Sequence, residues 1–219
     1  MRLTMRRYLL PLLLLGLLAS CSQRVYSTRE IVPQALTRHR LVAILPFDVQ
    51  LARIRLQDIA AAPDPEKQQE QRRLVAYQLQ QELLKQLAER QAKHPYSVQF
   101  QNVAETNSRL ERAGITYDNL NDHSMAELQA ALGVDAILSG ETSLFQPLPN
   151  GLAVALLVLT DTGGLAPSEV LTNVTIHDCQ SGELVWKFDH QLIGDLSPSP
   201  ATLARVLVRN SARTFPYRP

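Results

Sequence analysis

The sequence predicts an α/β fold, a single-domain sandwich in which a mixed sheet of about five to six strands packs against three to four helices. Three observations predict this class. A short apolar run precedes a long amphipathic helix, short and clearly bounded helices follow, and the C-terminal half changes to strand-rich sequence with an antiparallel meander before a last helix. No internal repeat divides this region, so we expect one domain over residues 41–219.

The first 20 residues are typical of a secretory signal. Three arginines precede an apolar run from Leu9 to Leu18, which is far shorter than the ~20 residues that cross a bilayer. The run ends in Leu18-Ala19-Ser20-Cys21, which resembles the lipobox of bacterial lipoproteins. This resemblance implies cleavage after Ser20 and lipidation of Cys21, so that acyl chains hold the protein on a membrane. An uncleaved anchor, or an ordinary signal peptide with an incidental cysteine, is the alternative interpretation.

Charge and cysteine content exclude several classes of function. Cleavage removes three of the 22 basic residues, which leaves 19 against 21 acidic ones and a net charge near −2. This balance argues against electrostatic binding to nucleic acid, which needs a basic surface. With Cys21 lipidated, Cys179 has no partner for a disulfide and no second thiolate for a zinc site. We therefore predict no metal and no cofactor, and expect a packed core to supply the stability.

Residues 21–40 are expected to form a basic tether between lipid and domain. The segment has little apolar periodicity and carries four arginines against one acid, namely Arg24, Arg29, Arg38, Arg40 and Glu30. A flexible chain of this length spans on the order of 25 Å. The residues directly after Cys21 lack the acids that send some lipoproteins to the cell surface. We therefore expect the domain to lie at the outer membrane and to face the periplasm.

The domain is expected to open with a central strand over Leu41–Phe47, because this run is apolar on both faces. A long helix over Glu66–Lys93 follows, rich in strong helix formers. Its apolar stripe recurs at every fourth position, at Val75, Leu79, Leu83 and Leu87. Pro95 ends this helix.

Ser97–Val103 alternates apolar and polar residues, as a half-buried strand does. Two short helices come next. One runs over about Glu105–Ala113 before Gly114, and the other begins at the capping box of Ser124 and Glu127, reaches Leu132 and stops at Gly133.

Four strands are predicted in the C-terminal half: Ala136–Phe145, Leu152–Thr160, Val170–Asp178 and Leu184–Ile193. The second is a continuous apolar run, so we expect it to be buried within the sheet. The last two form a hairpin across Cys179-Gln180-Ser181-Gly182, where Gly182 takes a positive φ. A closing helix begins at Ser199 and Pro200 and runs to about Thr214.

Three short motifs resemble a family of envelope lipoproteins: Val42–Phe47, Gly133–Gly140 and Asp178–Trp186. Its best-known members are the curli-secretion-channel lipoprotein, the penicillin-binding-protein activator lipoprotein and the N-terminal domain of the Tol-system β-propeller protein. The ending Phe215-Pro216-Tyr217 also resembles that of uncharacterised lipoproteins from Bacteroidota-type bacteria. The resemblance covers about Leu41 to Tyr217. It implies an envelope protein and supplies no catalytic residue.

Two polar motifs are candidates for chemistry. His177-Asp178-Cys179 places two ligands on one face of a strand, whereas a zinc site takes three or four. Asp161-Thr162-Gly163-Gly164 has no following helix to hold a phosphate and no second copy to form a pair of aspartates. We interpret the first as the entry to a hairpin turn and the second as a loop, so no catalytic residue is predicted.

Arg205, Arg209 and Arg213 recur at every fourth position of the closing helix, opposite its apolar face. One interpretation is a solvated face, since cations near a helix C-terminus are favourable. The other is a docking face for an acidic partner or an anionic cell-wall polymer. These three arginines are the candidate partner-binding residues.

Together these patterns predict a lipid-anchored, non-enzymatic module that binds or regulates a partner in envelope assembly or transport. The partner would be an envelope protein or a cell-wall polymer, and open edge strands offer a route to homo-oligomers. The alternative is an envelope hydrolase or carbohydrate-processing enzyme with a site of dispersed residues. A deep pocket with paired acids of shifted pKa favours the enzyme, whereas an exposed apolar or basic patch favours the binding module.

Overall fold

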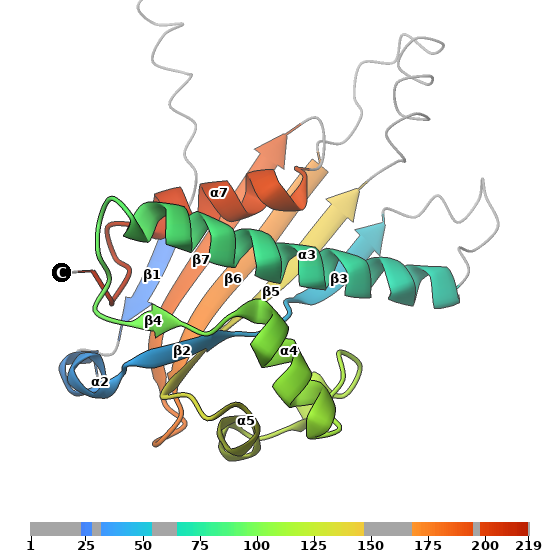
Figure 1. Ribbon diagram of the computed structural model, residues 1–219. Helices are drawn as coiled ribbons and strands as arrows, with labels where there is room; N and C mark the ends of the chain where they lie inside the picture. The colour runs from blue at the N-terminus through green and yellow to red at the C-terminus, as the bar shows by residue number, and fades with distance from the viewer. Residues whose placement is uncertain (1–22, 28–31, 54–64, 147–167, 195–197, 219) are drawn as a thin grey trace, which may run out of the picture.

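A mixed sheet organises the fold in a computed structural model that describes residues 23–27, 32–53, 65–146, 168–194 and 198–218 (Figure 1). Seven strands pair among these residues in the order β1-β7-β6-β5-β2-β4, and β3 pairs with β5. They are β1 (Gln23–Ser27), β2 (Leu41–Ile44), β3 (Asp48–Arg53), β4 (Gln99–Phe100), β5 (Ala136–Gln146), β6 (Ser168–Asp178) and β7 (Leu184–Gly194).

β5 lies at the centre of this sheet. β2 and β3 follow one of its edges in parallel, one after the other, and β4 is parallel to β2. β6 pairs with the other edge of β5 and is followed by β7 and β1, each antiparallel to its neighbour. The chain therefore joins a parallel N-terminal half to an antiparallel C-terminal half; the mixed sheet and the antiparallel C-terminal pairing are as predicted from the sequence.

Five α-helices are described: α2 (Val32–Arg38), α3 (Pro65–Gln91), α4 (Val103–Arg112), α5 (Met125–Leu132) and α7 (Pro200–Ser211), with a 3₁₀ turn η1 at Leu120–Asp122. The last four lie where the sequence predicts helices, and local signals bound them. Ser124 and Glu127 form the expected capping box, and Gly133 ends α5 in the left-handed conformation at φ 64°. Ser199 caps α7 by accepting from the Thr202 N–H.

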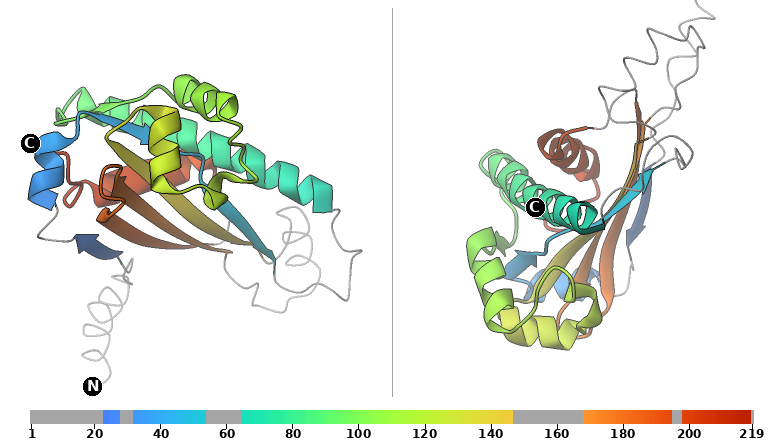
Figure 2. Two further views of the ribbon diagram at one scale, coloured as in Figure 1. Left: turned by 90° about the horizontal axis from the view of Figure 1, so that it is seen from below. Right: turned by 90° about the vertical axis from the view of Figure 1, so that its right-hand side faces the viewer.

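The helices divide between the two faces of the sheet (Figure 2). α3 and α7 lie side by side on one face and bury the larger core, which contains Leu79, Leu83, Trp186 and Phe188. α4 and α5 pack on the other face near β2, over a second core that contains Leu110 and Leu128. β2 supplies both cores and is buried on both faces, as its sequence predicts.

The α/β class with a mixed sheet is confirmed, but the number of elements differs. The described sheet has seven strands where five to six are predicted, and five α-helices where three to four are predicted. β1 was missed because Gln23–Ser27 is short and mostly polar, and becomes a strand only by pairing with β7. The predicted strand Leu152–Thr160 lies outside the described residues.

The predicted strand over Ser97–Val103 is much shorter than expected. Only Gln99–Phe100 pairs with β2, and α4 already begins at Val103. Asn102 is the reason, because its side-chain oxygen accepts from the Ala104 N–H at 2.8 Å and caps the helix. The residue that continues the strand alternation therefore starts a helix.

The folded region also begins earlier than Leu41. Residues 21–40 are predicted to be a tether, yet their described parts form β1 and α2. Ala35 and His39 are fully or almost fully buried, so this stretch packs onto the domain. Tertiary contacts of a few residues therefore place this segment on the domain, although its basic, weakly apolar composition is typical of a linker. Among the helices of the described ranges, none has the length and apolar character that a membrane span requires.

We expect Gly140→Ala to destabilise the fold. A Cβ at Gly140 would lie 2.2 Å from a ring carbon of Phe47, the residue that precedes β3 and packs across β5. Overpacking of this kind costs about 1–3 kcal/mol of unfolding free energy, which urea titration measures. In a Phe47→Leu background the same substitution should cost less, because the smaller side chain leaves room. Equal costs in both backgrounds would contradict this packing.

Candidate functional site

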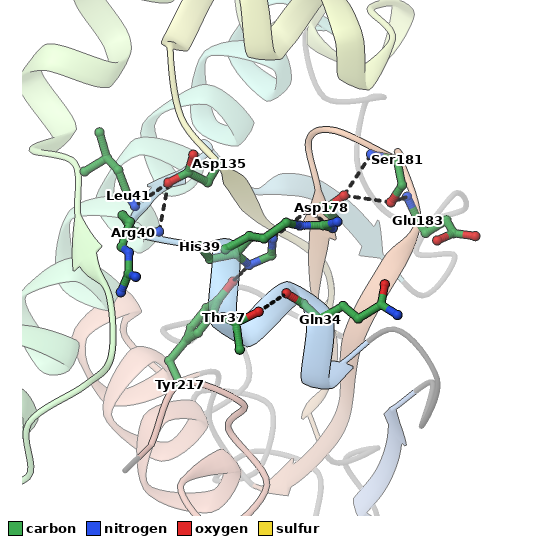
Figure 3. Close-up of polar contacts among 11 residues, drawn as sticks. Gln34, Thr37, His39, Arg40, Leu41, Asp135, Asp178, Ser181, Glu183 and Tyr217 are labelled. Carbon is green, nitrogen blue, oxygen red and sulfur yellow. Dashed lines mark hydrogen bonds and ion pairs between the residues drawn. The ribbon is translucent and has the colours of Figure 1, made fainter.

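The first polar cluster surrounds the buried carboxylate of Asp178, the last residue of β6 (Figure 3). Nε2 of His39 lies 2.7 Å from Oδ1, and Nη2 of Arg38 lies 3.2 Å from the same oxygen. Oδ2 accepts from the backbone N–H and the hydroxyl of Ser181 at 2.8 and 2.7 Å. The Tyr217 hydroxyl lies 2.7 Å from Nδ1 of His39. We call these five residues the Asp178 network.

The electrostatics of the Asp178 network favour a fixed arrangement. Burial by itself raises the pKa of Asp178, but the hydrogen bonds from His39 and Ser181 and the nearby guanidinium together lower it from 3.8 to about 2. The ionised carboxylate can only accept, so Nε2 of His39 carries a proton. Burial also raises the pKa of the Tyr217 hydroxyl far above its ordinary value, so this phenol stays neutral.

A carboxylate, an imidazole and a hydroxyl in line resemble a catalytic triad, but the exposure argues against catalysis. His39 is 1% exposed and Tyr217 is 0% exposed, so no substrate reaches the hydroxyl. The cluster instead joins α2, the β6–β7 turn and the C-terminal segment. We therefore interpret the Asp178 network as a structural cluster that holds these three segments together.

A second carboxylate holds the same stretch of chain. Oδ2 of Asp135, the residue before β5, accepts from the backbone N–H groups of Arg40 and Leu41 at 2.8 and 2.9 Å. The segment from Arg38 to Leu41, which leads from α2 into β2, is thus bound by Asp135 and Asp178 together (Figure 3). Both acids belong to the motifs that resemble envelope lipoproteins, and both serve the fold.

The candidate binding site is a cleft of about 440 Å³ between α3, α4 and the loop after α4. Ligand pockets usually measure ~300–1,000 Å³. We call it the tyrosine cleft; its apolar lining is Pro46, Leu110, Ile115 and Leu120, and its polar lining is Arg73, Tyr77, Asn107, Glu111, Thr116, Tyr117 and Asp118.

Two tyrosines and an ion pair give the tyrosine cleft its chemistry. The rings of Tyr77 and Tyr117 lie 6.3 Å apart between centroids, and the Tyr117 hydroxyl accepts from the Val49 N–H at 3.1 Å. Nη2 of Arg73 lies 2.7 Å from a carboxylate oxygen of Asp118. These two side chains are 49% and 41% exposed, so the pair stands in solvent and is available to a ligand.

Buried hydrogen bonds fix the walls of the tyrosine cleft. Gln80 on α3 is fully buried and donates to the Ile44 carbonyl at 2.7 Å, while its amide exchanges hydrogen bonds of 2.9 and 3.0 Å with Asn107 on α4. The loop is closed by Asn119, whose side chain accepts from the Thr116 N–H at 2.7 Å. These bonds hold α3 and α4 in their relative positions and fix the conformation of the loop after α4 without a ligand.

The tyrosine cleft presents aromatic rings and hydrogen-bonding groups to a ligand. The part of its lining that the described residues form contains no serine, cysteine, histidine or lysine, the side chains that often act as nucleophile or general base. Burial raises the pKa of both tyrosines, so their phenols are neutral hydrogen-bonding groups at physiological pH. Asp118 pairs with an arginine rather than with a second acid, unlike the paired carboxylates of acid–base enzymes.

The structure places the predicted site residues as follows. Arg205, Arg209 and Arg213 are all exposed, and none forms an ion pair with another described residue. Only the first two lie on α7, because the helix ends at Ser211 and Arg213 follows it. Cys21 and the Asp161–Gly164 motif lie outside the described residues.

His177-Asp178-Cys179 forms the entry to the β6–β7 turn, as interpreted from the sequence, and Gly182 in that turn has a φ of 73°. Burial and the charges of Asp178 and Asp135 raise the pKa of Cys179 to about 12, so its thiol is unreactive. Within the described ranges, no three residues among histidines, cysteines and acids come together in a group that would hold a metal ion.

No family model and no curated protein matches this sequence. Solved structures resemble it. Lipoprotein GNA1162 from Neisseria meningitidis is 13% identical over 80% of this chain and 96% of its own, with a TM-score of 0.43. The PelC dodecamer from Paraburkholderia phytofirmans is 14% identical over 87% and 94%, with a TM-score of 0.36. The LpoB C-terminal domain from Salmonella enterica is 7% identical over 76% and 95%, with a TM-score of 0.32. Similarities this distant assign no function.

Sequence reasoning missed the tyrosine cleft. Tyr77 reads as a flank of the apolar stripe of the long helix, and Tyr117 lies in a short loop without a motif. The available signal was the pair Arg73 and Tyr77, one helical turn apart, beside a stripe that faces the core. No local sequence pattern predicts that the loop after α4 contacts this turn of α3.

The Asp178 network should make stability depend on acid pH. The folded-state pKa of Asp178 lies below the ordinary value of 3.8. The contribution of its carboxylate to the unfolding free energy is therefore present above about pH 4 and is lost as the pH falls towards 2. We expect the gap in unfolding free energy between wild type and Asp178→Asn to shrink by about 2 kcal/mol over this range. Urea titrations at pH 6, 4 and about 2.5 measure it. A gap that stays constant would contradict the assignment.

Proposed function

We propose that the protein is a lipid-anchored, non-enzymatic binding module of the cell envelope, held at the outer membrane on the periplasmic side. The observation that carries the binding role is the tyrosine cleft. It offers aromatic faces, an apolar base and exposed charges on a rigid frame, and these are the features of protein-binding sites. The lipobox-like sequence that ends at Cys21 supports the anchor.

The occupant that fits the tyrosine cleft is a short segment of a partner protein. Tyrosine and arginine are enriched among residues that dominate binding energy, because each combines a large contact area with hydrogen bonding. Arg73 and Asp118 offer one charge of each sign at the opening, so a segment with both a basic and an acidic group is complementary to them. The partner class is an envelope protein engaged in assembly or transport.

Site-specific photocrosslinking in intact cells tests this role. A photoreactive residue at Glu111, which lines the cleft and is exposed, should capture a defined partner identified by mass spectrometry. The same residue at Glu89, exposed on α3 outside the cleft, is the matched control. Adding Tyr77→Ala and Tyr117→Ala should reduce capture at least ~10-fold, the effect of removing a dominant contact. Equal capture at both positions, or capture unaffected by tyrosine removal, would refute the proposal.

A second contact surface is proposed at Arg205, Arg209 and Arg213. Their guanidinium groups are exposed and, within the described part of the chain, unpaired, so an anionic partner or cell-wall polymer meets no competing carboxylate there. β1 ends the strand order among the described residues, and its outer edge is the proposed surface for homo-oligomers.

Charge reversal at these arginines distinguishes a docking surface from a face that is only solvated. The Arg205→Glu, Arg209→Glu variant should lose pull-down of its partner while the melting temperature stays within a degree or two of the wild type, since exposed charges contribute little to stability. The matched control is Arg112→Glu on α4, which is exposed on another helix. Undiminished pull-down by the double variant would leave the arginines as solubilising residues only.

A further inference from the structure

The proposed lipid anchor is very close to the first strand. β1 begins at Gln23, two residues after Cys21, and an extended chain spans at most about 7 Å over that distance. β1 pairs with β7 over its whole length, with Gln23 opposite His190. A lipid on Cys21 therefore brings one particular end of the sheet to the membrane: the end where β1 and β6 begin and where β5 and β7 finish (Figure 1).

This end of the sheet carries two exposed apolar side chains. Ile193 is 62% exposed and Leu171 is 48% exposed. Both point away from α3 and α7, because the buried residues of β6 and β7 alternate with them. Leu171 lies opposite Gln191, so it is a diagonal neighbour of Ile193 across the two strands.

The register fixes how far these side chains reach. Ile193 lies three residues beyond His190, which is about 10 Å past the start of β1 in the direction of the anchor. The link from Gln23 to Cys21 spans at most about 7 Å. The polar layer on each side of a bilayer is about 5–8 Å thick. An anchored Cys21 therefore cannot hold Ile193 clear of the headgroups unless the sheet lies flat on the membrane.

We propose that Leu171 and Ile193 form a membrane contact, and that the domain stands on the bilayer with this end of the sheet in the headgroup layer. The occupant of the apolar pair is thus the lipid surface beneath the anchor. The inference rests on the proposed lipidation of Cys21. In this arrangement the domain has a defined orientation on the membrane, which a flexible tether would not give it.

An acid lies directly beside the apolar pair. Glu169 lies opposite Ile193 across the strand pair, and its carboxylate accepts from the side-chain amide of Gln191. An acid held beside the apolar pair disfavours anionic lipid. Phosphatidylcholine vesicles are therefore the probe.

Depth-dependent fluorescence quenching tests the orientation. Single variants Leu171→Cys and Ile193→Cys of the full lipidated chain are labelled with an environment-sensitive fluorophore and reconstituted into phosphatidylcholine vesicles with a nitroxide in the headgroup layer. Glu183→Cys, exposed in the turn at the opposite end of β7, is the control. Cys179 stays in place because it is 4% exposed. All three substitutions replace side chains that are exposed or half-exposed and support no buried contact.

We expect a blue shift and a loss of emission at 171 and 193 with vesicles, and neither at 183. Equal quenching at all three positions, or none at 171 and 193 while the protein floats with the vesicles, would overturn the orientation. The same blue shift without vesicles would also overturn it, because another part of the chain would then cover the pair. A purified protein whose N-terminus carries no lipid by mass spectrometry, and which does not float, would overturn the anchor itself.

Discussion

The carboxylate of Asp178 is the constraint on which the rest of the structure depends. A buried charge is costly unless every lone pair finds a donor, and its donors come from α2 and from the β6–β7 turn, with Tyr217 supporting His39 from the C-terminal segment. Ser181 lies three residues from Asp178, but α2, His39 and Tyr217 lie far from it in the sequence, so all the donors are in place only when these segments have assembled. The network thereby fixes α2 against the domain and keeps the N-terminal segment beside the sheet.

The fixed N-terminal segment has a consequence for function. If residues 21–40 were a flexible tether, the domain would sample any orientation within on the order of 25 Å of the membrane. With β1 paired to β7, the proposed anchor instead directs one end of the sheet to the lipid. α5 leads into the start of β5, at the opposite end. In the proposed orientation α5 therefore lies on the side away from the bilayer, and the tyrosine cleft, whose Tyr117 bonds Val49 opposite Thr142 in the middle of β5, lies above the end that contacts the lipid.

Residues of the motifs that resemble envelope lipoproteins stabilise the fold. Asp135 binds backbone N–H groups, Asp178 anchors the network, and Trp186 is buried between Phe188 and Phe215. Such motifs specify a scaffold on which different sites can be built. Apart from Pro46, the residues that line the tyrosine cleft lie outside all three motifs, so the cleft is the part of this chain that its own function would set.

The sequence by itself determined the class of fold, the approximate boundaries of α3 and α5, the start of α7, and the β6–β7 turn. Each depends on signals within one or two turns of chain, such as the Ser124 capping box and the positive φ of Gly182. Only the tertiary structure decided that Gln23–Ser27 is a strand, that Asp178 is the buried centre of a network, and that Tyr77 meets Tyr117 in a cleft. Each of these depends on contacts between distant segments, and no local pattern of side chains encodes the distance between them.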